Sequence, residues 1–166
     1  AGGIWSLGLS EGVLRNMLRQ LKYQQKQVMV PGLHSFVTEG LHRITALQEY
    51  LVAVPVPLHK EKLAQRGFNQ SKLIFQKPLA DYGIAMEDWL IRTKATKPQY
   101  GLSGVQRREN LHQVFELAEK KSLQGRRILL VDDIMTTGAT LLECGGVLKK
   151  AGAVDITGGV VGTGGI

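Results

Sequence analysis

The chain has 166 residues, of which 43% are hydrophobic and 21% are charged, and its formal net charge is +7. This length suits one domain with one substantial core, and this composition excludes a disordered or fibrous chain. No apolar run approaches the roughly 18 residues that a membrane-spanning helix needs, and the N-terminus lacks the features of a secretory signal. We therefore expect no membrane insertion.

A single cysteine, Cys144, excludes an internal disulfide and a cysteine-based zinc site within this sequence. The simplest interpretation is a reducing compartment, so we expect a cytoplasmic protein in which Cys144 packs inertly on a helix. The positive net charge favours polyanionic partners, and both pyrophosphate-bearing metabolites and nucleic acid qualify. Because the basic residues are spread among several segments, charge alone does not separate these two classes.

Two amphipathic helices are predicted in the first third of the chain. In residues 10–23, with Ser10 as the N-cap, apolar side chains recur at helical spacing; they are Val13, Leu14, Met17, Leu18 and Leu21. A second helix follows Pro31. Its expected buried stripe consists of Leu33, Phe36, Val37, Leu41, Ile44 and Leu47.

Residues 51–56 form a short, nearly unbroken apolar run that predicts a strand buried on both faces, ended by Pro55 and Pro57. We expect a polar, basic loop next. It carries His59, Lys60, Lys62 and Arg66. Residues 69–80 predict a helix that Pro78 must kink or divide.

Leu90 and Ile91 indicate a further strand. Residues 93–104 lack periodicity and predict a long mobile loop, a feature that is usually functional or disordered in compact domains. Ser103 and Gln106 have the spacing of a capping box that opens a helix. Residues 114–117 fit a strand or a continuation of that helix, and the sequence does not decide between them.

The last third of the chain predicts a strand, a loop, a helix and a final strand. After a turn at residues 124–125, the strand covers residues 128–131, the loop 132–138 and the helix 139–150, with the last strand at 154–161. Strands that alternate with helices imply an α/β fold with a mainly parallel sheet.

The most informative stretch is residues 128–140, in which a buried strand is followed by Asp132 and Asp133, a tight Thr/Gly loop and a helix. In an open α/β sheet, ligands bind at the carboxyl ends of the strands. A loop that enters a helix N-terminus supplies N–H donors for a phosphate, and Gly138 lets the backbone approach it closely. The two acids would repel that phosphate but would accept hydrogen bonds from sugar hydroxyls. The pattern therefore predicts a site for a sugar phosphate.

Other interpretations of this stretch explain less of it. The chain has no G-x-x-x-x-G-K-[ST], which excludes a P-loop, and no G-x-G-x-x-G follows a strand. A receiver domain would account for the paired acids but not for the Thr-Thr-Gly-Ala-Thr loop. An ordinary strand–turn–helix with Asp at its tip is the remaining structural alternative.

The same stretch resembles the 5-phosphoribosyl 1-pyrophosphate (PRPP) signature of type I phosphoribosyltransferases. Three further segments make the chain similar to the competence-associated ComF family, also called ComFC. They are Pro55-Val56-Pro57-Leu58-His59, then Arg66-Gly67-Phe68-Asn69-Gln70, then Thr96-Lys97-Pro98-Gln99 with Arg107-Arg108-Glu109-Asn110 and Phe115. The resemblance runs from about residue 9 to residue 161.

The resemblance implies a type I phosphoribosyltransferase fold, a twisted and mainly parallel sheet flanked by helices. It implies an N-terminal helical or hood segment at residues 1–48 and the phosphoribosyltransferase core at 49–166. Asp132 and Asp133 would accept from the ribose hydroxyls. The 5-phosphate would bind to Thr136, Thr137, Gly138, Ala139 and Thr140, and the diphosphate to a pyrophosphate loop of Val56, Pro57, Leu58 and His59.

The resemblance also implies cofactors and a moving part. Magnesium would be held by PRPP and by water against Asp132 and Asp133, with no direct protein ligand. Residues 93–107 would form a mobile hood that closes over the site. Family members commonly begin with a four-cysteine zinc module, so zinc is expected only in a module that this sequence does not contain.

Two functions from different classes remain open. In a transferase, pyrophosphate would leave the anomeric carbon, with Arg66, Lys97 and Arg107 as catalytic cations, but no segment identifies the acceptor. Alternatively, the protein would bind PRPP or ribose 5-phosphate without turnover and act in DNA uptake as an adaptor for single-stranded DNA and a competence helicase. Aromatic residues make up only 6% of the chain, and no basic–aromatic cluster is evident, which counts mildly against direct DNA binding.

Overall fold

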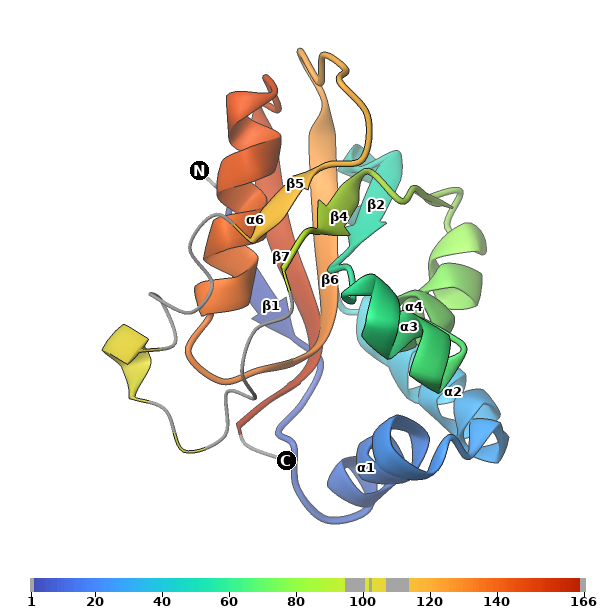
Figure 1. Ribbon diagram of the computed structural model, residues 1–166. Coiled ribbons are helices and arrows are strands. Elements are labelled where there is room, and N and C mark those ends of the chain that lie inside the picture. Colours follow the sequence, from blue (N-terminus) through green and yellow to red (C-terminus); the bar gives the residue numbers. More distant parts are fainter. Residues whose placement is uncertain (1, 95–100, 102, 107–113, 165–166) are drawn as a thin grey trace.

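The computed structural model describes residues 2–94, 101, 103–106 and 114–164. A five-stranded sheet lies at its centre (Figure 1). The strands are β1 (Ile4–Ser6), β2 (Val52–Pro55), β3 (Ala85–Met86), β6 (Arg127–Met135) and β7 (Asp155–Thr163). Their order is β1-β7-β6-β2-β3, and every pairing between them is parallel. Beside this sheet, β4 (Leu90–Arg92) and β5 (Phe115–Leu117) form an antiparallel pair.

Helices cover both faces of the sheet. They are α1 (Gly12–Gln24), α2 (Val30–Leu41), α3 (Lys60–Arg66), α4 (Gln70–Ala80) and α6 (Ala139–Lys150), with two short 3-10 turns at Gln27–Met29 and Leu47–Glu49. One core cluster joins α6, β4 and β5 to the sheet, and the other joins α1, α2 and α4 to its opposite face. The predicted α/β architecture with a mainly parallel sheet is confirmed.

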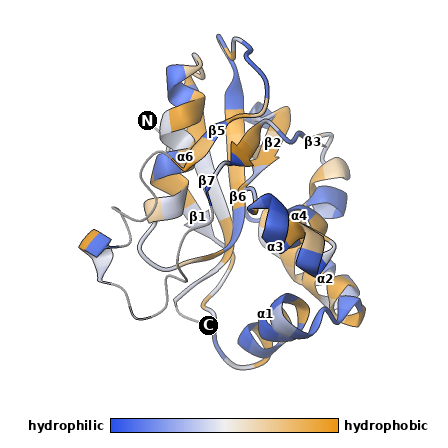
Figure 2. Ribbon diagram, viewed as in Figure 1, coloured by the Kyte–Doolittle hydropathy of each residue, from blue (hydrophilic) through white to orange (hydrophobic). Residues whose placement is uncertain are grey.

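The first half of β6 supplies alternate side chains to the two cores, which explains the apolar run at residues 128–131. Ile128 and Leu130 belong to the cluster with α6, whereas Leu129 and Val131 belong to the cluster with α4. A strand buried on both faces needs apolar residues at every position. Figure 2 shows this concentration of hydrophobic residues on β2 and β6, in contrast to the mainly hydrophilic α3. Cys144 is buried in the α6 cluster, and burial raises the pKa of its thiol, as expected for a packing residue.

β6 is longer than predicted, and this corrects the position of the two acids. Asp132 and Asp133 lie within the strand, not in a loop after it. The strand continues because its partner β7 also continues: Asp132 pairs with Val160 and Met135 with Thr163. Periodicity could not show this, since the extension depends on a neighbouring strand.

The predicted basic loop after β2 was wrong, because most of it forms α3. His59 is the N-cap of α3, and its Nδ1 accepts from the Glu61 backbone N–H at 3.4 Å. Gly67 ends the helix with φ +84, a conformation that favours glycine. Seven residues are too few to show helical periodicity.

Two further helix predictions were wrong in detail. Pro78 was predicted to kink or divide its helix, and it does not divide it: α4 is continuous through Pro78. Because Pro78 lies in the last turn, it removes a single helical hydrogen bond. Ser10 is not the N-cap of α1. Its N–H donates to Thr163 O at 2.9 Å, and the helix begins two residues later, after Glu11.

The strand β1 was not predicted from the sequence. Of residues 114–117, which fit either a strand or a helix, Phe115–Leu117 form the strand β5, paired with β4. β1 packs along a glycine stretch of β7: a Cβ on Gly158 would lie 3.1 Å from Ile4 Cγ1, and one on Gly159 would lie 3.0 Å from Trp5 Cζ3. These two glycines therefore allow β1 to approach.

The predicted capping box is present. Ser103 N donates to Gln106 Oε1 at 3.0 Å, and Gln106 N donates to Ser103 Oγ at 3.2 Å. In the described part of the chain, no helix combines the length and the apolar character that crossing a membrane requires.

The hydroxyl of Tyr50 contacts two side chains at the start of β7. Tyr50 OH donates to Asp155 Oδ2 at 3.0 Å and lies 2.6 Å from the buried Thr157 Oγ1. We expect Tyr50→Phe to lower the free energy of unfolding by about 1–3 kcal/mol, because it removes the partner of a buried group. Urea denaturation measures the loss. The control Tyr23→Phe, at a side chain 65% exposed, should change it by less than about 0.5 kcal/mol; equal effects of both changes would contradict the prediction.

Candidate active site

The two acids at the end of β6 are held by the first turn of α4. Ser71 Oγ donates to Asp132 Oδ1 at 3.0 Å, and Gln70 Nε2 donates to Asp133 Oδ2 at 2.6 Å. Each acid also accepts from the next backbone N–H, Asp132 from Asp133 at 2.9 Å and Asp133 from Ile134 at 2.7 Å. Gln70 and Ser71 are buried. The pair of carboxylates is therefore held by side chains of α4 that lie some 60 positions earlier in the chain.

Within the described residues, the side-chain oxygen of Gln70 is an unsatisfied hydrogen-bond acceptor. Its Oε1 is buried and has no hydrogen-bond partner among the residues that the structure describes. Buried polar atoms without a partner are rare and call for an explanation such as a bound ligand or water. Gln70 Oε1 is therefore an acceptor without a described partner in the amide group whose nitrogen binds Asp133.

The environment of Asp132 disfavours its charged form. Desolvation raises the pKa of this carboxyl well above its ordinary value, and the neighbouring charge of Asp133 raises it further, against the hydrogen bonds from Ser71 and the backbone. New donors, such as sugar hydroxyls, would favour the ionised form.

The predicted phosphate loop lines a small hollow. Thr136, Thr137, Gly138, Ala139 and Thr140 surround it together with Asp132, Ile134, Met135 and Leu141, and its volume is ≈ 50 Å³. Gly138 is the N-cap of α6 with φ +79, and α6 has no acidic residue in its first turn. The positive end of the helix dipole is therefore unopposed by a helix carboxylate at this point. The structure brings these residues and Asp132 together, as the sequence predicted.

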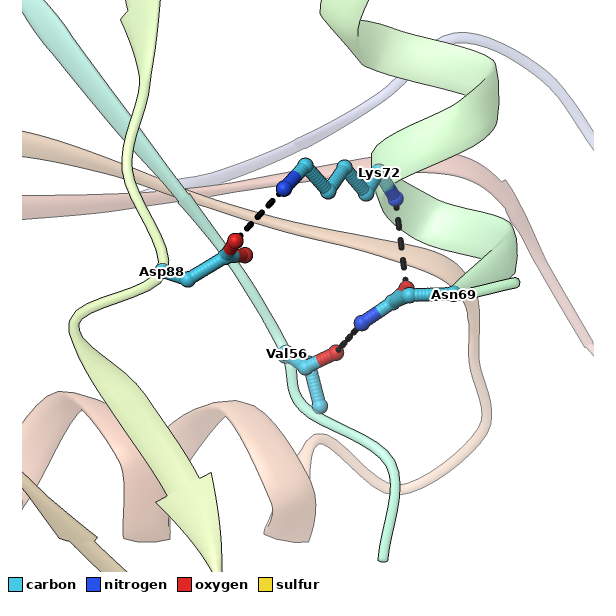
Figure 3. Close-up of polar contacts among 4 residues, drawn as sticks. All are labelled: Val56, Asn69, Lys72 and Asp88. Carbon is cyan, nitrogen blue, oxygen red and sulfur yellow. Dashed lines mark hydrogen bonds and ion pairs between the residues drawn. The ribbon is translucent and has the colours of Figure 1, made fainter. Parts of the chain in front are cut away.

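The predicted pyrophosphate loop is anchored at its first residue (Figure 3). Val56 N donates to Val131 O at 2.9 Å, and Val56 O accepts from Asn69 Nδ2 at 2.9 Å. Asn69 is in turn the N-cap of α4, and its Oδ1 accepts from Lys72 N at 3.2 Å. Because the Val56 amide is used and Pro57 has no N–H, any backbone donors from this loop to a ligand come from Leu58 or His59.

The charges of three other cations act on Lys62 of α3; we call Lys22, Lys62, Arg66 and Arg92 the cation cluster. The pKa of Lys62 is lowered by desolvation and then by the charges of Arg92, Lys22 and Arg66. A hydrogen bond from Gln25 Nε2 to Gln65 O, 3.0 Å long, ties the end of α1 to α3. Mutual repulsion within such a cluster is relieved when an anion binds.

Of this cluster, only Arg66 is among the predicted site residues. Lys62 and Arg92 belong to no motif that indicates a function. Arg92 is half-buried, its guanidinium lies 5.6 Å from the centre of the Phe115 ring, and the charge of Asp132 acts on it. The predicted catalytic residues Lys97 and Arg107 lie outside the described residues. In the described part of the chain, no three His, Cys, Asp or Glu side chains are grouped to hold a metal.

Comparison with known families identifies the class of this protein. The family model described as "Phosphoribosyl transferase domain" matches residues 92–161, which include the acid pair and the phosphate loop. Residues 92–161, which include β6 and α6, are therefore similar to a phosphoribosyltransferase domain, and the parallel sheet with flanking helices is the α/β architecture that the sequence predicted. A solved hypoxanthine phosphoribosyltransferase from Staphylococcus aureus is 13% identical, with a TM-score of 0.45 over 79% of this chain and 61% of that one.

Curated relatives narrow the class to a family. The DNA utilization protein YhgH of Escherichia coli (strain K12) is 36% identical over 148 residues, which cover 86% of this chain and 64% of that protein. Competence protein ComFC of Streptococcus pneumoniae is 32% identical over 144 residues, covering 86% and 60%. Competence protein F of Haemophilus influenzae is 40% identical over 105 residues, covering 62% and 46%. The chain belongs to the ComF/ComFC family, and it spans less than two thirds of the length of these relatives.

Because the pKa of Asp132 is raised, we expect the fold to become more stable when this carboxylate is replaced by a neutral group. Ionisation of this carboxyl destabilises the fold as the pH rises from 3.8, its ordinary pKa, through the raised folded pKa. We expect Asp132→Asn, whose amide oxygen can keep both hydrogen bonds, to increase the free energy of unfolding at pH 7. The increase should disappear below the ordinary pKa, where Asp132 is protonated in both states.

Urea denaturation at a series of pH values measures this difference. Glu119→Gln, at an exposed position, controls for the loss of one negative charge. A gain that is independent of pH, or one that Glu119→Gln reproduces, would contradict the assignment of the effect to a desolvated Asp132.

Proposed function

We propose that this protein binds PRPP with magnesium at the carboxyl end of β6 and transfers its phosphoribosyl group with release of pyrophosphate. The observation that carries the proposal is the joint geometry of the acid pair and the hollow. Two carboxylates fixed by Gln70 and Ser71 stand beside a loop that enters the N-terminus of α6. A dianion suits the helix end, and a furanose with two hydroxyls suits the carboxylates.

Each part of the site has a separate role in this proposal. The 5-phosphate lies against residues 136–140, and Asp132 and Asp133 accept from the ribose hydroxyls. The orphaned Gln70 Oε1 adds an acceptor on the same side. Residues 1–48 supply the helices α1 and α2 and also the strand β1 of the central sheet, beside the predicted core of residues 49–166. The charge of Lys22 in this segment acts on Lys62.

Departure of pyrophosphate requires stabilisation of negative charge. Arg66, with Lys62 and Arg92, supplies that stabilisation from the cation cluster, close to the loop of residues 56–59. Lys97 and Arg107 remain predicted contributors. The oxygen donors of Asp132, Asp133 and Gln70 fit a magnesium ion that keeps its water shell, and bound magnesium would neutralise charge on the diphosphate.

Calorimetric titration with PRPP and magnesium tests the binding step. We expect binding to the unmodified protein and a loss of at least about tenfold in affinity in the double variant Asp132→Asn with Asp133→Asn, because charge-assisted hydrogen bonds to the ribose are weakened. Asp81→Asn with Glu87→Gln removes the same charge at exposed positions and should bind normally. If neither PRPP nor ribose 5-phosphate binds, the proposal fails. Pyrophosphate release in the presence of nucleobases or amines then separates turnover from binding alone.

A second candidate function is an adaptor that binds single-stranded DNA, alongside a competence helicase. The cation cluster favours it, since Lys22 on α1 and Lys62 on α3 together present positive charge across two helices. The names of the relatives, which refer to DNA utilization and competence, point in the same direction. In this case a liganded phosphoribosyl site would serve structure or regulation.

Fluorescence anisotropy with labelled oligo-dT at several salt concentrations tests this candidate. We expect Lys22→Ala with Lys62→Ala to weaken binding and to reduce the slope of log affinity against log salt by roughly 0.7 per lost phosphate contact. Lys149→Ala with Lys150→Ala, at the far end of α6, is the matched control. Binding that tolerates Asp132→Asn with Asp133→Asn would place DNA outside the ribose site, and equal slopes for the two lysine pairs would reject the cluster as its surface.

A further inference from the structure

A larger cavity than the phosphate hollow lies between α3, α4 and β4. Its volume is ≈ 540 Å³, within the range of about 300–1,000 Å³ that small-molecule sites occupy. Its walls are largely apolar; they include Leu58, Leu63, Phe68, Leu73, Leu90 and Ile91. Pro57, Leu58 and Arg92 border both this cavity and the proposed diphosphate site, but no role proposed above fills the space between α3 and α4.

The cavity persists because α3 does not pack into a core. No residue of α3 is buried, and Leu63, which faces the cavity, is 42% exposed. α3 is held at its two ends instead: His59 caps its start, and Asn69, just beyond its end, binds Val56 O (Figure 3). A helix fixed in this way leaves room between its apolar side and α4.

The cavity lining carries more positive than negative charge, which favours an anionic ligand. Lys60, Lys72 and Arg92 line it against a single carboxylate, Asp88, among the residues that the structure describes. Figure 3 shows the Lys72 side chain extending from α4 toward Asp88, and Lys72 Nζ lies 2.5 Å from Asp88 Oδ2. The Asp88 side chain is 61% exposed and that of Lys72 33%, so an incoming carboxylate can compete with Asp88 for the ammonium group.

The position of the cavity argues against the acceptor of the proposed transfer as its occupant. Pro57 and Leu58 belong both to the cavity and to the loop proposed to hold the diphosphate. Pyrophosphate would leave from this side, whereas a displacing acceptor approaches the anomeric carbon from the opposite side.

We propose that this cavity is a binding site for a small, mainly apolar molecule that carries one anionic group, next to the phosphoribosyl site. The apolar walls contact the body of this molecule, and Lys72 and Lys60 pair with the anion. The site does not depend on phosphoribosyl transfer, so it can be tested without PRPP.

Calorimetric titration with 1-naphthoate, in the absence of PRPP, tests the proposal. We expect naphthoate to bind, and its neutral analogue 1-naphthamide to bind roughly threefold to tenfold more weakly, the range for partly exposed ion pairs. Leu63→Trp should abolish binding by filling the cavity. Leu51→Trp, at a leucine 71% exposed outside the cavity, is the matched control and should bind normally.

Two charge variants give effects of opposite sign. Asp88→Asn should tighten naphthoate binding, because Lys72 loses its competitor, and Lys72→Met should weaken it. If Leu63→Trp does not fold, Gln76→Trp fills the cavity from an exposed position on α4. Failure of naphthoate to bind, binding that survives a filling variant, or equal affinities for naphthoate and naphthamide would overturn the proposal.

Discussion

The contact between the first turn of α4 and the two acids of β6 is the constraint on which the rest of the site depends. Gln70 and Ser71 are buried and hold Asp133 and Asp132 through their side chains. The same turn begins with Asn69, which fixes the end of β2 through Val56. One helix start therefore positions both the acid pair and the loop at the end of the neighbouring strand.

The charged groups of the candidate site lower the stability of the free protein. A desolvated carboxylate beside a second carboxylate is unfavourable in the free protein, which the raised pKa of Asp132 expresses. The cation cluster is also unfavourable in the free protein, because the positive charges of its other members repel that of Lys62. A bound ligand with complementary charge or hydrogen bonds would relieve the unfavourable interactions in both groups. The free protein is therefore less stable than it would be without these charges, and ligand binding would recover this loss.

The site shows how far local sequence reasoning reaches. The strand, the Thr/Gly loop and the start of α6 are contiguous in the chain, so their chemistry could be predicted together and the hollow gathers the expected residues. Gln70 stood in a motif that indicated the family, but nothing in its neighbourhood showed that it would meet Asp133. Arg92 lies outside every motif recognised in the sequence, and its pairing with Phe115 of β5 and its bridge to His59 form only in the folded chain.

The α/β class, the full extent of α6 and the grouping of Asp132 with residues 136–140 could be predicted from the sequence, because they depend on short-range periodicity and on contiguous residues. Long-range packing set the length of β6, the presence of β1, the helical state of residues 60–66 and the partners of the acids. Strand extension needs a partner strand, a seven-residue helix has too few turns for a periodic signal, and side chains 60 positions apart meet only after folding. The cavity beside α3 belongs to the same group, since a space between elements is not encoded in any one of them.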